Sequence, residues 1–174
     1  TNYSSPKQIP GTTWGIVSGR GGTSAVGAVK TDGTLWVWGD DDDGTLGLGQ
    51  RDQHKNSPFQ VPGTTWSSLG GGYRYFVATK TDGTLWSWGQ NTYGQLGQNA
   101  PDNNKRSSPT QIPGTTWASG QANLDGNVNH AGCIKTDNTL WMWGENSAGD
   151  LGQNDKTNQS SPVQMPGEQW VQTG

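Results

Sequence analysis

The chain has 174 residues, of which 28% are hydrophobic and 14% charged, and its formal net charge is −3. Its lysines and arginines are scattered rather than clustered, which argues against binding to a nucleic-acid backbone. It contains no apolar run long enough to span a bilayer, so we expect no membrane insertion. The ten tryptophans recur at fixed places. They predict a folded core built from few large residues.

One stretch occurs three times and organises the chain. Its copies are KTDGTLWVWGDDDDGTLG from Lys30, KTDGTLWSWGQNTYGQLG from Lys80 and KTDNTLWMWGENSAGDLG from Lys135. A second element, SSPKQIPGTTW and its relatives, begins at Ser4, Asn56, Ser107 and Ser160. Such self-similarity is typical of propellers and solenoids. It predicts repeats at approximately 4–55, 56–106 and 107–159, with a partial fourth at 160–174.

Turn residues punctuate each repeat. The Pro-Gly pair of the second element predicts a type II turn, and the tryptophan that follows it is expected to begin a strand. Asp32-Gly33, like Asp82-Gly83, predicts a two-residue hairpin turn. The third copy has Asn138 at the glycine position, and asparagine is the next best residue for a positive φ.

The strand after this turn is apolar on both faces. Period-two alternation places Trp36 and Trp38 on one face, with Leu35 and Val37 on the other. Such a strand is expected in a sheet that is covered on both sides, with its Trp face the more tightly specified. No helical periodicity is visible. The sequence therefore predicts an all-β fold.

These motifs closely resemble the repeat of the regulator of chromosome condensation family, whose pattern reads H-S-L-A-L-K-T-D-G-x-V-Y-S-W-G-x-N-x-x-G-Q-L-G. The resemblance covers essentially the whole chain, although the family's histidine survives only at His130. It implies a β-propeller of four-stranded blades, usually seven in this family.

Blade number is the main question that the resemblance raises. Closed propellers have roughly four to eight blades, whereas this sequence holds three full repeats and the start of a fourth. The remaining blades are expected either from a longer form of the same chain, which we favour, or from self-association. The single cysteine, Cys133, aligns with Ala28 and Ala78 and is expected to be a small buried residue.

The acidic run from Asp40 to Asp43 replaces QNTY and ENSA of the other copies. Clustered carboxylates can bind Ca²⁺, which makes Asp40 and Asp42 candidate ligands. Asp41 aligns with Asn91 and Asn146, and an Asp at that place can close an Asx turn. A solvated loop is therefore favoured over a metal site.

The loops that differ between copies are the better guide to function, because a repeat scaffold presents its differences in loops. Candidate partner-binding residues in these loops are Tyr73, Arg74, Asn91, Tyr93 and Asp125. The third copy is also longer than the others between its tryptophan and Lys135, over 121–129. Tyrosine and arginine are the types that often anchor interfaces.

His54 and His130 have no nucleophile or metal-ligand partner at a recognisable spacing. We therefore expect neither enzyme activity nor a cofactor. The leading hypothesis is a non-enzymatic binding or structural module whose loops contact a protein or a glycan at an extracellular, cell-surface or virion location. The resemblance also implies two alternatives, guanine-nucleotide exchange on a small GTPase and inhibition of an enzyme by a secreted propeller.

Overall fold

The computed structural model describes residues 5–18, 25–100, 103–120, 124–167 and 170. Within these ranges the chain is built of strands and turns, with no helix. A search of the same ranges finds no helical segment with the length and hydropathy needed to cross a membrane.

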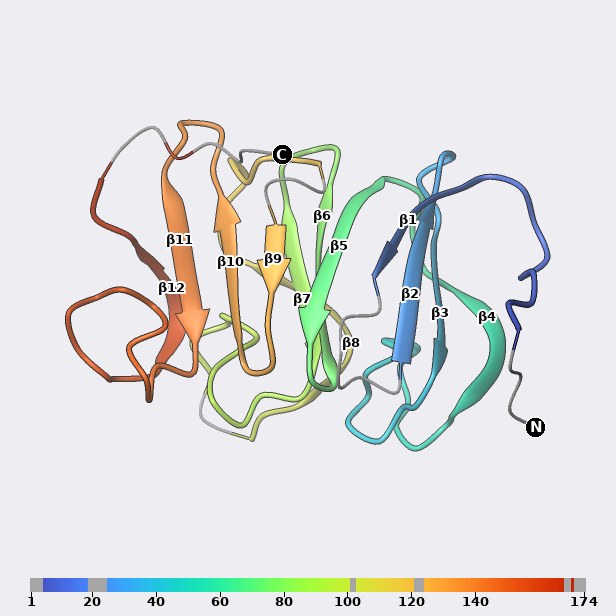
Figure 1. The fold of residues 1–174 in the computed structure, drawn as a ribbon, viewed down its shortest axis with the longest axis horizontal. Coiled ribbons are helices and arrows are strands. Elements are labelled where there is room, and N and C mark those ends of the chain that lie inside the picture. The colour runs from blue at the N-terminus through green and yellow to red at the C-terminus, as the bar shows by residue number, and fades with distance from the viewer. Residues whose placement is uncertain (1–4, 19–24, 101–102, 121–123, 168–169, 171–174) are drawn as a thin grey trace.

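The strands form three antiparallel sheets of four strands each, which are the blades of the fold. Figure 1 shows them side by side in chain order. Blade 1 contains β1 (Trp14–Ser18), β2 (Ala25–Lys30), β3 (Leu35–Gly39) and β4 (Lys55–Val61). Blade 2 contains β5 (Trp66–Gly72), β6 (Tyr75–Lys80), β7 (Leu85–Gly89) and β8 (Arg106–Ile112). Blade 3 contains β9 (Leu124–Gly126), β10 (His130–Ile134), β11 (Leu140–Gly144) and β12 (Gln159–Gln164).

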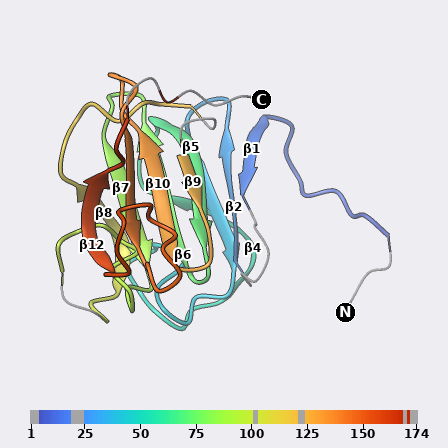
Figure 2. The ribbon, with the colours of Figure 1, turned by 60° about the vertical axis from the view of Figure 1, so that its left-hand side comes forward.

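The boundaries of the blades do not coincide with those of the sequence repeats. The outer strand of blade 1, β4, comes from the Ser-Pro element that opens the second repeat, and β12 likewise comes from the fourth copy of that element. The first strands β1, β5 and β9 lie next to one another along the inner side. The first copy of the element, from Ser5 to Pro10, is exposed and lies away from the sheets (Figure 2).

The turn predictions are confirmed in part. The glycines of the Pro-Gly pairs have φ between 110° and 115°, as a type II turn requires. The Asp-Gly hairpin is longer than predicted, because Gly33 N donates to Lys30 O while Lys30 N donates to Thr34 O. Only Gly33 of these turn residues has a positive φ, at 78°. The turn is therefore a three-residue turn with a glycine bulge rather than a two-residue type I′ turn.

The third repeat departs from the prediction that each tryptophan begins a strand. Trp14 and Trp66 do begin β1 and β5. Trp117, however, forms only an isolated bridge with Lys135, and the inner strand begins later, at Leu124. The additional residues of this repeat separate the tryptophan from the strand, so the two no longer form one continuous segment.

Adjacent blades pack face to face: one face of each sheet contacts the opposite face of the next sheet. Leu35 and Val37 of blade 1 belong to the same buried cluster as Trp66, Leu69 and Trp88 of blade 2. In blade 2 both Leu85 and Trp88 are 0% exposed, which confirms that this strand is covered on both sides. The hydrophobic core therefore lies in the junctions between blades, not within any single blade.

Candidate functional site

A polar loop follows the third strand of each blade and is held by one buried side chain. Asp41, Asn91 and Asn146 accept hydrogen bonds from the backbone N–H of Leu46, Leu96 and Leu151 at 2.9, 3.1 and 2.9 Å. All three side chains are at most 1% exposed. The predicted equivalence of these positions is therefore correct, but the bond spans five residues. The Asx turn lies one residue earlier, where Asp42 N donates to Asp40 Oδ1 at 2.9 Å.

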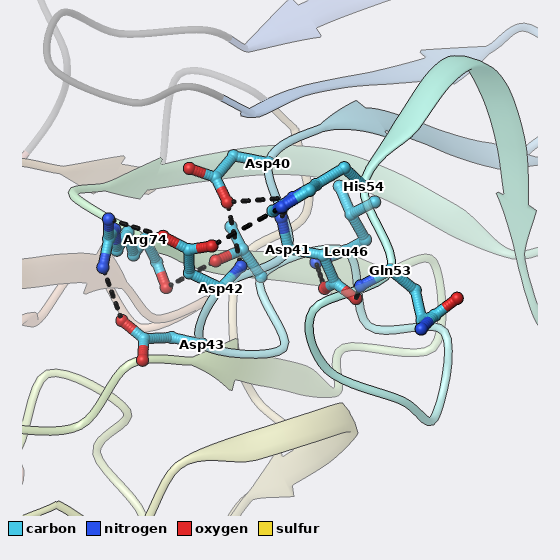
Figure 3. A network of polar contacts seen from close by, with 9 residues as sticks. Asp40, Asp41, Asp42, Asp43, Leu46, Gln53, His54 and Arg74 are labelled. Atoms are coloured by element: carbon cyan, nitrogen blue, oxygen red, sulfur yellow. Dashed lines mark hydrogen bonds and ion pairs between the residues drawn. The ribbon is translucent and has the colours of Figure 1, made fainter.

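In blade 1 this loop contacts His54, a residue that the sequence analysis did not connect to it (Figure 3). His54 Nδ1 lies 3.1 Å from Asp41 N and 3.3 Å from an oxygen of Asp40. Its Nε2 atom lies 3.8 Å from an oxygen of Asp42. Ligand atoms of Asp40, Asp42 and His54 all lie within 4.8 Å of one another.

These three residues have a geometry that a cation could use, but their atoms already have partners. The backbone N–H of Asp41 points to His54 Nδ1, and Arg74 Nη2 lies 2.7 Å from an oxygen of Asp42. A metal ion would have to displace this arginine or share the carboxylate with it. The contacts of Asp40 and Asp42 thus resemble an ion-paired loop more than an oxygen-lined cation site.

Arg74 and Lys105 neutralise the most buried carboxylate of the loop. The side chain of Asp43 is 4% exposed, and it pairs with Arg74 at 3.5 Å. Its other oxygen contacts the Lys105 ammonium of blade 2. A buried carboxylate needs such partners because the interior solvates charge poorly. These ion pairs join blade 1 to blade 2 and fix the position of the Arg74 guanidinium.

Arg74 also has an uncommon backbone conformation, with φ of 58°. Arginine rarely adopts such an angle, which costs roughly 1 kcal/mol or more for a residue with a Cβ. The carbonyl of Arg74 accepts a bond from Gln90 N at 2.8 Å and one from Thr45 Oγ1 at 3.2 Å. The surrounding loops therefore hold this turn in a conformation that a glycine or asparagine would reach more easily.

The turn that holds Arg74 is joined through its backbone to the turn between β9 and β10 of blade 3, and each of the two turns carries an exposed apolar side chain. Tyr73 N donates to Val128 O at 2.9 Å, and the two side chains are 37% and 51% exposed. The Arg74 guanidinium lies 5.1 Å from the centre of the Tyr73 ring. Beneath them, the buried hydroxyl of Tyr75 reaches the carbonyls of Asn127 and His130, and burial raises the pKa of this phenol. We call Tyr73, Arg74 and Val128 the loop patch.

The structure separates the predicted partner-binding residues. Tyr73 and Arg74 lie in the loop patch. Asn91 is only 1% exposed and holds its own loop, so it does not belong to the surface. Tyr93 is half-buried in the loop of blade 2, and Asp125 is exposed on β9 with its carboxylate bonded to Gly126 N. Val128 lies in the variable stretch 121–129 but was not named as a candidate, and His54 was not connected to this site, because both come close to these residues only through contacts between loops.

Cys133 is buried on β10, as predicted from its alignment with two alanines. Burial raises the pKa of its thiol to about 12. The thiolate is the reactive form of cysteine, so this side chain is inert at neutral pH.

The chain forms four-stranded antiparallel blades that pack against one another, with their first strands on the inner side. This arrangement defines it as part of a β-propeller. The model of the "Regulator of chromosome condensation (RCC1) repeat" matches residues 32–78, 82–119 and 137–173, and a second model of the same description matches 66–95. Because the matches cover more than half of the sequence, the chain belongs to this repeat family.

Solved structures share the fold at low sequence identity. Human WBSCR16 aligns with a TM-score of 0.79 and 22% identity over 95% of this chain and 44% of its own. Yeast RCC1 (Prp20), in a complex with Kap60, aligns with a TM-score of 0.74 and 17% identity over 89% of this chain and 37% of its own.

Prp20p from Saccharomyces cerevisiae, in a structure whose description reports binding to Gsp1p and histones, has a TM-score of 0.72 and 16% identity over 83% and 36% of the two chains. The chain thus spans less than half the length of each of these proteins. Membership of the repeat family, rather than the fold alone, supports a binding or regulatory module.

Proposed function

We propose that this chain is a non-catalytic module that binds a protein partner through the loop patch. The observation that carries the proposal is the backbone hydrogen bond from Tyr73 N to Val128 O, which joins two turns of different blades that each carry an exposed apolar side chain. Arg74 is fixed next to them by ion pairs with Asp42 and Asp43. A rigid aromatic anchor with a neighbouring arginine is the combination that dominates many protein interfaces.

The strained turn supports the same proposal. An arginine held at positive φ by contacts of its own carbonyl is a feature that often accompanies binding sites. Solved proteins of the same fold, such as the yeast one crystallised with Kap60, bind other proteins. The acidic Asp40 and Asp42 beside the patch would favour a partner with a mixed or basic surface.

A photo-crosslinking experiment tests this proposal. A photoreactive phenylalanine analogue is placed at position 73, and the chain is exposed to an extract of its native source. The matched control carries the analogue at Phe59, which is 45% exposed on β4 and lies next to a cation, Lys55, at 4.8 Å. We expect position 73 to trap a defined protein that Val128→Ser removes. Equal trapping at positions 73 and 59 would contradict the proposal.

The extracellular, cell-surface or virion location is part of the same proposal. It is supported by a composition poor in charge, with 28 glycines and only 14% charged residues. Immunodetection on intact cells or particles of the source tests it. The alternative of nucleotide exchange is checked with GDP release from small GTPases, and acceleration of that release would overturn our reading of the patch as a simple docking site.

A further inference from the structure

A lysine lies between two tryptophans in every blade, and this arrangement forms a pocket at two places. Lys80 Nζ lies 4.6 Å from the ring centre of Trp66 and 4.2 Å from that of Trp86. Lys135 Nζ lies 4.8 Å from Trp117 and 3.8 Å from Trp141. Each pair of indoles is edge-to-face, with centroids 6.3 Å apart. The two sites are structural equivalents in consecutive blades.

Each site opens into a cavity that two consecutive blades build together. The cavities have volumes of about 370 and 340 Å³, within the range of roughly 300–1,000 Å³ that is typical of small-molecule sites. The return segment of the preceding repeat closes one wall, and the Ser-Pro dipeptide of the outer strand closes another. The residues that complete the walls are Gly47, Leu48, Gly49, Pro62, Ser108 and Pro109 in the first cavity, and Gly97, Asn99, Pro113, Ser161 and Pro162 in the second.

The indoles are fixed before any ligand arrives. Trp86 Nε1 donates to Thr84 Oγ1 at 2.8 Å, and Trp141 Nε1 donates to Thr139 Oγ1 at 2.8 Å. The threonine hydroxyl is in turn held by the aspartate of the hairpin turn, at 2.6 Å in both blades. A rigid aromatic wall loses little conformational entropy on binding.

The ammonium groups of the two lysines, in contrast, still have N–H donors that a ligand could use. Within the part of the chain that the structure describes, the Lys80 and Lys135 ammonium groups lie over indole rings and form no hydrogen bond or ion pair, although the charge of each lysine helps to lower the pKa of the hairpin carboxylate, Asp82 or Asp137, on the same repeat. An ammonium has three N–H donors. A half-buried cation of this kind therefore favours an anionic group in the cavity.

We propose that these two cavities bind acidic sugar residues of a polysaccharide. The C–H bonds of a pyranose ring carry partial positive charge and pack against the negative face of an indole. The indoles open to such a ring are the half-buried Trp86 and Trp141, since Trp66 and Trp117 are only 2% and 1% exposed. A carboxylate on the same ring would accept hydrogen bonds from the lysine. Because the same pocket recurs at consecutive junctions, a polymer with a repeating unit could occupy both, and the two weak sites would then reinforce each other. This surface shares no residue with the loop patch, so the inference stands apart from the proposed function.

The test uses calorimetric titration of the intact chain with oligogalacturonate. Lys80→Met and Lys135→Met keep the aliphatic stem and remove the charge, and each is expected to weaken binding about tenfold, with a larger loss in the double variant. Lys30→Met is the matched control, because Lys30 lies 4.7 and 4.3 Å from Trp14 and Trp36 but the described cavity that Lys30 lines contains neither of these indoles. Lys80→Arg, which keeps the positive charge, is expected to retain binding even if Lys80→Met unfolds.

Uncharged dextran and poly-glutamate separate the sugar from the charge. We expect oligogalacturonate to bind more tightly than either, with an affinity that falls as salt is added. Equal binding of poly-glutamate would overturn the proposal, because the cavity would then recognise charge alone. Loss of binding in Lys30→Met equal to that in Lys80→Met, or no binding by the unaltered chain, would overturn it as well.

Discussion

Trp38 and Trp88 occupy the same position in consecutive repeats, but their surroundings differ. Trp88 is 0% exposed, and its Nε1 donates to Thr45 O of blade 1 at 2.9 Å. Trp143 repeats this arrangement with Gln95 O of blade 2 at 2.9 Å. Trp38 is only half-buried, and within the described ranges no carbonyl accepts from its indole. The environment of Trp88 and that of Trp143 are thus each set by the preceding blade.

The comparison shows that the contacts that stabilise a blade are made with its neighbouring blades. Gly47 lies so close to Trp88 that an added Cβ would stand 2.7 Å from Nε1 of the indole, and Gly97 faces Trp143 in the same way, at 2.9 Å. In blade 3 the corresponding Gly152 faces the side chain of Met165 instead. A repeat protein of this kind is stabilised by interfaces between adjacent units more than by any unit alone.

The largest effect is expected from removing the buried indole. Trp88→Ala should destabilise the chain by about 3–5 kcal/mol, because it leaves a cavity and an unpaired carbonyl in the junction. Trp38→Ala should cost clearly less, since its indole is already half in solvent. Urea denaturation followed by circular dichroism measures both. Similar losses of unfolding free energy in the two variants would contradict the claim that Trp88 and Trp38 lie in different environments.

A smaller effect is expected at the glycines of the polar loops. Gly94 has φ of 80°, and an added Cβ would stand 2.7 Å from Ser160 Cα, whereas Gly149 has φ of 90° and no atom within 4 Å of that position. Gly149→Ala should therefore cost only the backbone strain of about 1–2 kcal/mol. Gly94→Ala adds the collision with β12 and should cost more. The difference in urea midpoints is the measurement, and a larger loss at Gly149 would be evidence against the junction geometry.

The smallest effect is expected at the hairpin turns, which are alike in all blades. Hydrogen bonds from the Thr84 side chain and backbone hold the pKa of Asp82 below its usual value, and Thr34 and Thr139 do the same for Asp32 and Asp137. The folded-state pKa is the lower one. The contribution is therefore complete above about pH 4 and is lost as pH falls further.

Substitution tests whether these turns depend on the position of the blade. Asp32→Asn and Asp82→Asn should each reduce the fall in melting temperature between pH 5 and pH 2, by the same small amount. Thermal unfolding across that pH range is the measurement. A marked difference between the two variants would mean that the turns, like the tryptophans, sense the neighbouring blade.

Local chemistry made much of this fold predictable. The type II turns at the Pro-Gly pairs, the positive φ of Asn138 and the alternation of Leu35 with Trp36 depend on residues close in sequence. Where the prediction failed, the reason was also local. Trp117 does not begin a strand because additional residues follow it, and the Asp-Gly turn takes three residues because the next threonine closes the pair.

The candidate site was less predictable. Tyr73 and Arg74 were singled out from the variation among repeats and stay a prediction as partner-binding residues. Asn91 proved to be buried; its candidacy failed because an asparagine that holds a loop and one that contacts a partner look the same in sequence. Val128 lies in the variable stretch 121–129 but was not singled out there, and His54 carried no signal, since their neighbours lie more than ten residues away or in another blade. Asp40 and Asp42 remain a prediction as metal ligands, and their contacts with His54 and Arg74 favour the ion-paired loop.

The sequence by itself determined the repeat, the all-β architecture and the turns, because short-range backbone preferences and the two-residue period of a strand are written in adjacent residues. Only the tertiary structure decided which copies of one motif are buried, which charges meet and where cavities form. Those properties arise at junctions, where each surface is supplied by a different repeat. Identical residues such as Trp38 and Trp88 therefore end in different environments.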